Sequence, residues 1–461
     1  MQKFYLLLFK PIFRLTRRLN TTVRDVGIFL CCFILIYIYF FSHIKKASGE
    51  AQIIGSILVA IMLAFSIDRE MKPISWNKAC YYPLLFFGVG ILMIGQIHSI
   101  GDGYLMYAFD ISILFPALYF AWNNRGDYER LFSLISAVII ILGLISFTRC
   151  VFLAFRGDLA MSAERVQGFT TNPNYLGMMG AVILISGLFS LSTNKNNKLW
   201  KTLSAICVGI GISFAVISVS RTAMLSEIIC ILAFAIYRTK SLIISKSGGL
   251  KVACKRCMLT ATLIGLVILL GLSLDDINYK MYEKMHAVSD KKAEELITKN
   301  PQQEVKEAEK ITQRIEAGGD TNTISSGRLA IWNIYSAEFS LWGKPLSVIK
   351  PQLKYAAETR AHNNIVDYLY RCGYIVGSFY IVYYIMQGIA GLRFLFSKRY
   401  TDPAHLFTVM MIGSYSVYAM LEISTLAFIR IVPCVYFLSI APIFVNENNK
   451  SYIKKEPQIH G

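Results

Sequence analysis

The sequence predicts an all-α membrane protein. Of its 461 residues, 55% are hydrophobic and only 16% are charged, whereas a soluble domain of this size would need far more charge on its surface. Continuous apolar stretches of about 17 to 25 residues, each long enough for a helix to cross a bilayer, recur from one end of the chain to the other. Because these stretches do not alternate between apolar and polar residues, they favour helices over the strands of a membrane barrel.

About twelve of these stretches are predicted to be transmembrane helices. Residues 1–26 precede them as a basic arm, in which Pro11 is expected to interrupt any long helix. Helices 1–9 fall within 27–274 and helices 10–12 within 362–445, while 275–361 forms a helical loop domain and 446–461 a polar tail. The predicted spans lie near Gly27–Phe41, Gln52–Ile67, Tyr82–Ile97, Tyr104–Trp122, Leu131–Phe155, Tyr175–Leu191, Leu203–Ser218, Thr222–Tyr237, Leu259–Leu274, Ile365–Phe396, Ala404–Met420 and Leu426–Val445.

The distribution of basic residues orients the chain. A net charge of +18 could indicate a nucleic-acid partner. However, most Lys and Arg residues lie in the N-terminal arm, the tail and the loops on the same side as these, and few lie in the short loops on the other side. Lys and Arg accumulate on the cytoplasmic side of membrane proteins. The arm and tail are therefore predicted to be cytoplasmic, with the lipid bilayer rather than nucleic acid as the partner.

Two polar segments on the predicted outer side flank apolar spans. In the first, Arg165 precedes Asn172-Pro173-Asn174, where Asn-Pro predicts a turn and Asn174 is expected to cap the next helix. In the second, Ser220-Arg221 lies in a turn so short that apolar helix surrounds the arginine. Because a buried cation is costly in a membrane, Arg221 is predicted to lie shallow or to have an anionic partner, such as Glu227 or a bound phosphate.

The 275–361 domain ends in a third polar segment. Arg328 opens a predicted amphipathic helix in which Leu329, Trp332, Tyr335 and Phe339 share one face, suited to rest on the membrane or on neighbouring helices. Arg328 could equally be ordinary surface charge. This segment therefore predicts a positive charge near the outer surface, but the residues around Arg328 do not show what the charge does.

His362 follows this segment and begins the next span. A neutral imidazole can accept a proton near neutral pH, although a hydrogen-bonded histidine in a helix cap would occupy the same position. Asn363 or Asn364 is expected to cap the helix. Further along, Asp367 and Arg371 at i, i+4 predict an internal ion pair, which lowers the cost of burying both charges.

Taken in order, these segments resemble the O-antigen ligase/polymerase superfamily, bacterial glycosyltransferases of the inner membrane that act on polyprenyl-diphosphate-linked glycans. The resemblance extends from Arg165 to about Gly377. In one departure, Gly373 and Gly377 are one residue further apart than the family's G-x-x-G, and their spacing also indicates close helix packing. The residues that carry the resemblance are Arg165, Gly168, Asn172-Pro173-Asn174, Gly177, Ser220-Arg221, Gly327-Arg328, Trp332, Ala361-His362-Asn363 and Gly373.

The resemblance implies an inverting, metal-independent transfer of a glycan from undecaprenyl diphosphate to a sugar hydroxyl, on lipid A-core or on a growing polysaccharide, without a cofactor. It places the active site on the extracytoplasmic face of the bacterial cytoplasmic membrane, with His362 as the base. Arginine suits the diphosphate because it is always charged and forms forked bonds to phosphate oxygens. The predicted diphosphate ligands are Arg165, Arg221 and Arg328, and the supporting residues are Asn172, Asn174, Ser220, Asn363 and Asp367.

A transporter is the alternative, either a flippase for lipid-linked oligosaccharides or an ion-coupled carrier. Asp110, Arg149 and Arg430 lie inside predicted spans, where charged residues are candidates for function, although pairing within the bundle would explain them equally well. A carrier usually contains two related halves, and the sequence shows no internal repeat. Ligase and polymerase use the same kind of donor, so the site residues do not distinguish these two enzymes.

Overall fold

The chain folds as a multi-pass helical membrane protein. In the described residues, ten helices are long and apolar enough to cross a membrane. The predicted tail and most of the predicted 275–361 domain lie outside these residues. The computed structural model describes residues 2–41, 48–98, 102–162, 165–193, 197–245, 250–286, 328–349, 361–397, 400–422 and 426–445.

The first four helices include one that the sequence did not predict. Pro11 lies inside α1 and does not end it, because the rings of Tyr5 and Phe9 pack on Phe120 at centroid distances of 5.8 and 5.7 Å and hold the helix in place. The predicted interruption is therefore wrong. These helices are α1 (Gln2–Thr16), α2 (Thr21–Phe41), α3 (Ser48–Ser66) and α4 (Lys78–His98).

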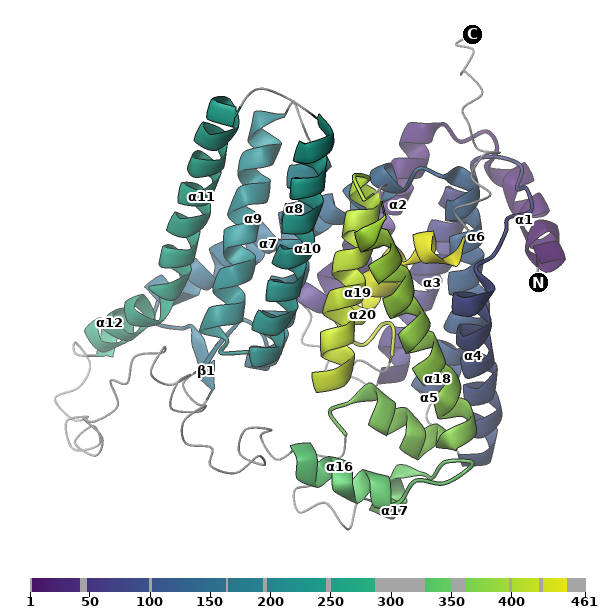
Figure 1. Ribbon diagram of the computed structural model, residues 1–461. Coiled ribbons are helices and arrows are strands. Elements are labelled where there is room, and N and C mark those ends of the chain that lie inside the picture. The colour runs from purple at the N-terminus through teal and green to yellow at the C-terminus, as the bar shows by residue number, and fades with distance from the viewer. Residues whose placement is uncertain are drawn as a thin grey trace, which may run out of the picture.

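The middle of the chain contains a hairpin where the sequence predicted only a loop. Strands β1 (Ala160–Ser162) and β2 (Arg165–Gly168) pair antiparallel, with Ser162 opposite Arg165. Around it, α7 to α11 form one group of helices (Figure 1). The helical elements of this part are α5 (Asp102–Phe109), the π-helical turn η1 (Asp110–Leu114), α6 (Phe115–Arg125), α7 (Tyr128–Phe155), α8 (Pro173–Thr193), α9 (Lys198–Ile217), α10 (Arg221–Ser245), α11 (Leu250–Leu272) and α12 (Leu274–His286).

Glycines allow α8 and α9 to pack closely. A Cβ atom at Gly180 would lie 2.7 Å from the carbonyl oxygen of Gly211, and one at Gly211 would lie 2.7 Å from the carbonyl oxygen of Gly180. Close backbone approach through small residues is typical of helix pairs in membranes.

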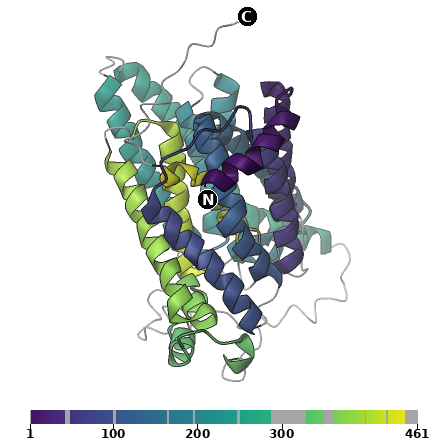
Figure 2. The same cartoon turned by 90° about the vertical axis from the view of Figure 1, so that its right-hand side faces the viewer.

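The remaining helices form the second part of the bundle, and α4 connects its two ends. At the start of α4, Asn77 donates its backbone N–H to Phe444 (2.8 Å). At its end, the ring of His98 contacts the carbonyl of Trp342 (3.1 Å), and α18 runs beside α4 along its length (Figure 2). These elements are α16 (Arg328–Ala337), α17 (Leu346–Ile349), α18 (Asn364–Phe396), α19 (Pro403–Leu421), α20 (Ile431–Ser439) and the 3-10 helix η3 (Ala441–Phe444).

A small second core joins α16 to the start of α18. In α16, Tyr335 is buried as predicted and Ile331 with it, whereas Leu329, predicted for the same face, is exposed. The ring of Tyr335 meets that of Tyr370 edge-on at 5.0 Å. The face that α16 packs against its neighbours therefore includes Ile331 and Tyr335 but not Leu329. The members of this core are Ile331, Tyr335, Ile349, Ala361 and Tyr370.

The helix α18 is broken at Gly373, although the sequence predicted a continuous span. Gly373 has φ +78°, and a Cβ atom there would lie 2.3 Å from the carbonyl oxygen of Leu341. The backbone of 340–344 fills the break, since Tyr374 donates to Ser340 (3.0 Å) and Lys344 donates to Tyr370 (2.9 Å). The predicted role of Gly373 in ordinary helix packing is therefore wrong. Because glycine has no side chain, this position can adopt a left-handed backbone next to another chain segment.

Two of the twelve predicted spans are not among the ten long helices. The stretch near Gln52 forms the shorter apolar helix Glu50–Ser66 within α3. The predicted last span is not a continuous helix, because only α20, nine residues long, and η3 are helical between 426 and 445. Leu426, Ala427 and Phe428 are fully buried in a non-helical segment, which a membrane protein tolerates where surrounding protein satisfies the backbone.

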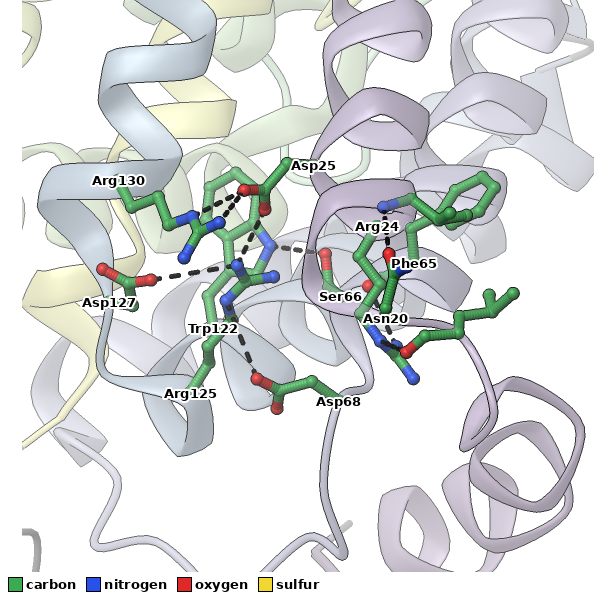
Figure 3. A network of polar contacts seen from close by, with 12 residues as sticks. Asn20, Arg24, Asp25, Phe65, Ser66, Asp68, Trp122, Arg125, Asp127 and Arg130 are labelled. Carbon is green, nitrogen blue, oxygen red and sulfur yellow. Dashed lines mark hydrogen bonds and ion pairs between the residues drawn. The ribbon is translucent and has the colours of Figure 1, made fainter. Parts of the chain in front are cut away.

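A network of ion pairs joins α2 and the segment after α3 to the end of α6 and the start of α7 (Figure 3). Arg125, whose side chain is 2% exposed, lies 3.1 Å from Asp25, 3.8 Å from Asp127 and 4.0 Å from Asp68. Arg130 donates its Nε–H to Asp25 as well (2.6 Å). Three carboxylates thus surround the buried guanidinium of Arg125. We name Asp25, Asp68, Arg125, Asp127 and Arg130 the inner network.

Candidate active site

A buried carboxylate, Glu422, lies at the centre of the candidate site. It follows the last residue of α19 and is 4% exposed. Its Oε1 accepts hydrogen bonds from Nη2 of Arg328 (2.9 Å) and from Nδ2 of Asn174 (3.2 Å). Its Oε2 lies 3.7 Å from Nδ1 of His362, which is longer than a hydrogen bond but close enough for an ion pair. Three predicted site residues from distant parts of the sequence therefore meet at one carboxylate.

Arg165 joins this group through Asn174. Its Nη2 donates to Oδ1 of Asn174 (2.6 Å), and its Nε donates to the carbonyl oxygen of Ser218 (2.7 Å). Arg165 begins β2, so the hairpin directs its side chain between the start of α8 and the turn after α9. We name Arg165, Asn174, Arg328, His362 and Glu422 the Glu422 cluster.

The start of α8 differs from the prediction. Asn172, rather than Asn174, precedes the helix, and its Oδ1 accepts a hydrogen bond from the backbone N–H of Asn174 (2.8 Å). Pro173 is the first helical residue, a position that proline favours because its missing N–H would be unbonded there. Asn174 lies in the first turn, and this leaves its amide to bridge Arg165 and Glu422.

The backbone of His362 adopts a left-handed conformation, with φ +50°, which is uncommon for residues other than glycine and concentrates at functional sites. Two contacts hold it. Asn363 caps α18 as predicted, accepting hydrogen bonds from the backbone of Ile365 (2.9 Å) and Val366 (3.2 Å). On the other side, Nε1 of Trp332 donates to the carbonyl oxygen of Ala361 (2.6 Å).

A second left-handed residue lies in the turn between α9 and α10. Val219 has φ +48°, unusual for a β-branched residue. It separates Ser218, which binds Arg165, from Ser220, whose Oγ accepts a hydrogen bond from Ala223 (3.4 Å). Arg221 then opens α10 with an exposed side chain. Both strained positions of this kind in the described residues thus border the candidate site.

Glu422 is held in its charged form. Burial raises the pKa of its carboxyl group, but the contact with His362 and the positive charges of Arg328 and Arg430 lower it by more, so the net pKa lies below the ordinary value of 4.5. Arg430, which the sequence placed inside the last span, therefore acts on the same carboxylate. Its guanidinium lies 4.8 Å from the ring centroid of Tyr175, the residue after Asn174.

Asp367 belongs to a separate pair near the break in α18. It is 3.0 Å from Nε of Arg371, which confirms the predicted ion pair. Asp367 also accepts a hydrogen bond from the hydroxyl of Tyr104 (3.3 Å), and the guanidinium of Arg371 lies 5.2 Å from the Tyr104 ring centroid. This pair fixes the first piece of α18 to α5 and so supports His362 from a distance.

The contacts of the Glu422 cluster unite Arg165, Asn174, Arg328 and His362. Arg221 lies close by, at the start of α10. The remaining supporting residues, Asn172, Ser220, Asn363 and Asp367, shape the surroundings of the cluster. Glu422 itself was not predicted. In the described residues no three His, Cys, Asp or Glu side chains gather as metal ligands would.

No family model matches the chain, and no curated protein is significantly similar to it in sequence. The chemistry of the site must therefore be argued from its residues. The cluster offers fixed positive charge for an anion, a carboxylate that can orient an imidazole, and an imidazole that is one-third exposed. Together these groups suit a reaction that removes a proton and releases a negatively charged leaving group.

Proposed function

We propose that the Glu422 cluster transfers a glycan from a polyprenyl diphosphate to a sugar hydroxyl, in the manner of the O-antigen ligase/polymerase superfamily that the sequence resembles. One observation carries the proposal: the imidazole of His362 and the guanidinium of Arg328 face the two oxygens of the same buried carboxylate. A proton acceptor and a phosphate-binding charge are thereby held side by side, and Asn174 connects Arg165 to them.

Glu422 orients the base in this mechanism. With Nδ1 of His362 directed to Glu422, the proton of the neutral imidazole lies on that nitrogen and Nε2 is left to accept a proton. Nε2 removes the proton of the acceptor hydroxyl as its oxygen bonds to the anomeric carbon. The bond from that carbon to the phosphate oxygen breaks, and the lipid diphosphate leaves with the electron pair. Attack opposite the leaving group inverts the anomeric configuration.

The arginines stabilise the leaving group. Charge develops on the diphosphate as the bond breaks, and a guanidinium provides positive charge with a fixed fork of N–H donors. Arg328 and Arg165 supply it directly in this proposal, and Arg221 lies at the adjacent helix start. The reaction needs neither a metal ion nor a cofactor, and the acceptor is a sugar of lipid A-core or of a growing polysaccharide chain.

We also propose the topology on which this function depends. About twelve segments cross the bacterial cytoplasmic membrane, including the short helix in α3 and the segment that contains α20. The 275–361 domain and the Glu422 cluster then lie on the extracytoplasmic side, and the inner network lies on the cytoplasmic side, as the distribution of Lys and Arg favours. The donor reaches the site from the outer leaflet.

The function is tested with purified protein in liposomes that contain an undecaprenyl-diphosphate-linked glycan, with a sugar acceptor added outside. We expect a new glycosidic bond with the wild type and a loss of about 100-fold or more with His362→Ala, because general-base catalysis contributes about 10² to 10⁴. His98→Ala is the matched control: the ring of His98 lies at the same end of the bundle and contacts the carbonyl of Trp342 in the 340–344 segment, so this variant should retain activity.

Two results would contradict the proposal. Full activity of His362→Ala, with normal expression and thermal stability, would show that His362 is not the base. Movement of lipid-linked glycan across the bilayer without a new glycosidic bond would indicate the transporter instead. Chelation by EDTA is expected to leave the rate unchanged.

Labelling of single engineered cysteines tests the topology. The native cysteines whose surroundings the structure describes are free and buried. Introduced cysteines should therefore react with a thiol reagent far more than these native ones. Cysteines at positions 165 and 362 should react with an impermeant thiol reagent from the extracytoplasmic side, and a cysteine at position 130 only from the cytoplasmic side. Opposite labelling of 165 and 362 would rule out a shared site.

A further inference from the structure

The segment before α20 carries an arginine into the apolar part of the bundle. From Arg430, α20 and η3 rise by about 14 Å and about 8 Å and end at Val445, which pairs with Trp76 at the opposite end of the molecule. Their combined length is less than the roughly 30 Å of bilayer hydrocarbon. Arg430 therefore lies deeper than Arg328, which enters from α16 outside the long helices.

A set of buried side chains holds this segment in position. The backbone N–H of Phe428 donates to Oε1 of Gln52 (3.0 Å), and Nε2 of Gln52 donates to Oδ2 of Asp110 (2.6 Å). The hydroxyl of Ser56 donates to the same oxygen (2.8 Å). Asp110 begins the π-helical turn η1, a local irregularity that often marks functional sites. These contacts satisfy backbone at membrane depth and fix the approach of the chain to Arg430.

The side chain of Arg430 is directed towards the Glu422 cluster. Its guanidinium stacks over the ring of Tyr175 at 4.8 Å, and Nη1 lies 4.0 Å from the sulfur of Met178. Both residues belong to α8, so this helix orients the guanidinium. Arg430 is also near enough to Glu422 to stabilise the carboxylate charge. A guanidinium at this depth is costly unless it serves a ligand or a partner, and stacking on an aromatic ring offsets part of that cost.

We propose that Arg430 binds the phosphate that carries the polyprenyl chain, while Arg328 binds the phosphate next to the sugar. The inference rests on the proposed function and adds a selectivity for lipid diphosphates over lipid monophosphates. The depth of the two arginines matches the order of groups in such a donor, whose lipid lies in the membrane and whose sugar lies outermost. Arg328 is also the one beside His362, where the sugar must react.

Binding of undecaprenyl diphosphate and undecaprenyl monophosphate to nanodisc-embedded protein tests this inference without turnover. The wild type should bind the diphosphate more tightly. Arg430→Gln should weaken the binding of both lipids about 10- to 100-fold, the effect of one charge-assisted contact, because both lipids carry the phosphate that is bonded to the polyprenyl chain. Arg328→Gln should weaken diphosphate binding only. Arg238→Gln is the matched control, because Arg238 also stacks on an aromatic ring (Phe234, 5.5 Å) but lies towards the other end of α10.

Unchanged affinity for either lipid in a folded Arg430→Gln protein would overturn the inference, as would an equal loss of both affinities in Arg328→Gln. If Arg430→Gln lowers the unfolding midpoint strongly, Arg430→Lys decides. Lysine keeps the charge but not the fork, so the affinity for both lipids should fall in part, and unchanged affinities would contradict the inference. Failure of the wild type to bind either lipid would instead contradict the proposed function.

Discussion

Two clusters of charged residues lie at opposite ends of α7, and they are built on different principles. In the inner network, which precedes and begins this helix, Arg125 is surrounded by Asp25, Asp68 and Asp127. The Glu422 cluster lies beyond the hairpin that follows the helix, and in it the positive groups outnumber the carboxylates. Here one carboxylate is shared by Arg328 and His362 and is influenced by Arg430.

The difference indicates what each cluster is for. A buried arginine among carboxylates is already neutralised, so it can join helices but has little charge left for a ligand. A carboxylate shared among several positive groups leaves the region cationic, which suits an anionic substrate. The inner network also has no left-handed residues other than glycine, whereas His362 and Val219 border the Glu422 cluster. We therefore expect mutations in the inner network to affect stability and those in the Glu422 cluster to affect activity.

The largest effect is expected for Arg125→Ala. Removal of one member of a buried ion pair typically costs about 3 to 5 kcal/mol, and the lower end is expected here because Asp25 and Asp68 keep Arg130 and Arg69 as partners. Thermal unfolding in detergent should show a much lower midpoint, while turnover per folded molecule stays near that of the wild type.

Arg69→Ala is the matched control for this variant. Arg69 is bonded to Asp68 of the same network at 2.9 Å, but its side chain is 53% exposed, and exposed pairs contribute less than about 1 kcal/mol. A similar loss of stability in both variants, or a loss of turnover in Arg125→Ala alone, would show that the two clusters do not differ as proposed.

The next largest effect is expected for Glu422→Gln. Glutamine has nearly the same shape but lacks the charge that fixes the imidazole of His362 and pairs with Arg328. Turnover should fall about 100-fold, within the range of general-base catalysis, with a smaller change in the unfolding midpoint than in Arg125→Ala. Unchanged turnover would mean that Glu422 has a structural role only, and the contrast between the clusters would fail.

Much of the fold could be predicted because its signals are local. Apolar length gave ten of the long helices, the Asn363 cap follows from an amide placed before an apolar run, and the Asp367–Arg371 pair follows from their i, i+4 spacing. The break at Gly373 could not be predicted, because it depends on the backbone of 340–344 entering between two apolar helical pieces that are continuous in sequence.

Glu422 could not be predicted for a related reason. It follows an apolar helix and has no motif around it, and its partners Asn174, Arg328 and His362 are remote in the sequence. The one available signal was an acidic residue at the predicted outer end of a span. The backbone around Arg430 was predicted to be helical because the residues there are apolar, whereas side chains of α3 and η1 hold it in a non-helical form.

The smallest predicted effect is on the pH dependence of stability. The pKa of Glu422 is lower in the folded protein than its ordinary value, which the unfolded chain should have. Its contribution to stability is therefore complete above that unfolded value and is lost as the pH falls through the folded pKa. The unfolding midpoint of the wild type should exceed that of Glu422→Gln near neutral pH, and the difference should shrink below about pH 4.3.

Asp158→Asn is the control, because the Arg156–Asp158 pair is about half exposed and should change this pH dependence little. If the wild type and Glu422→Gln lose stability in parallel across this range, the carboxylate is not stabilised by its positive neighbours, and the cationic character assigned to the Glu422 cluster is wrong.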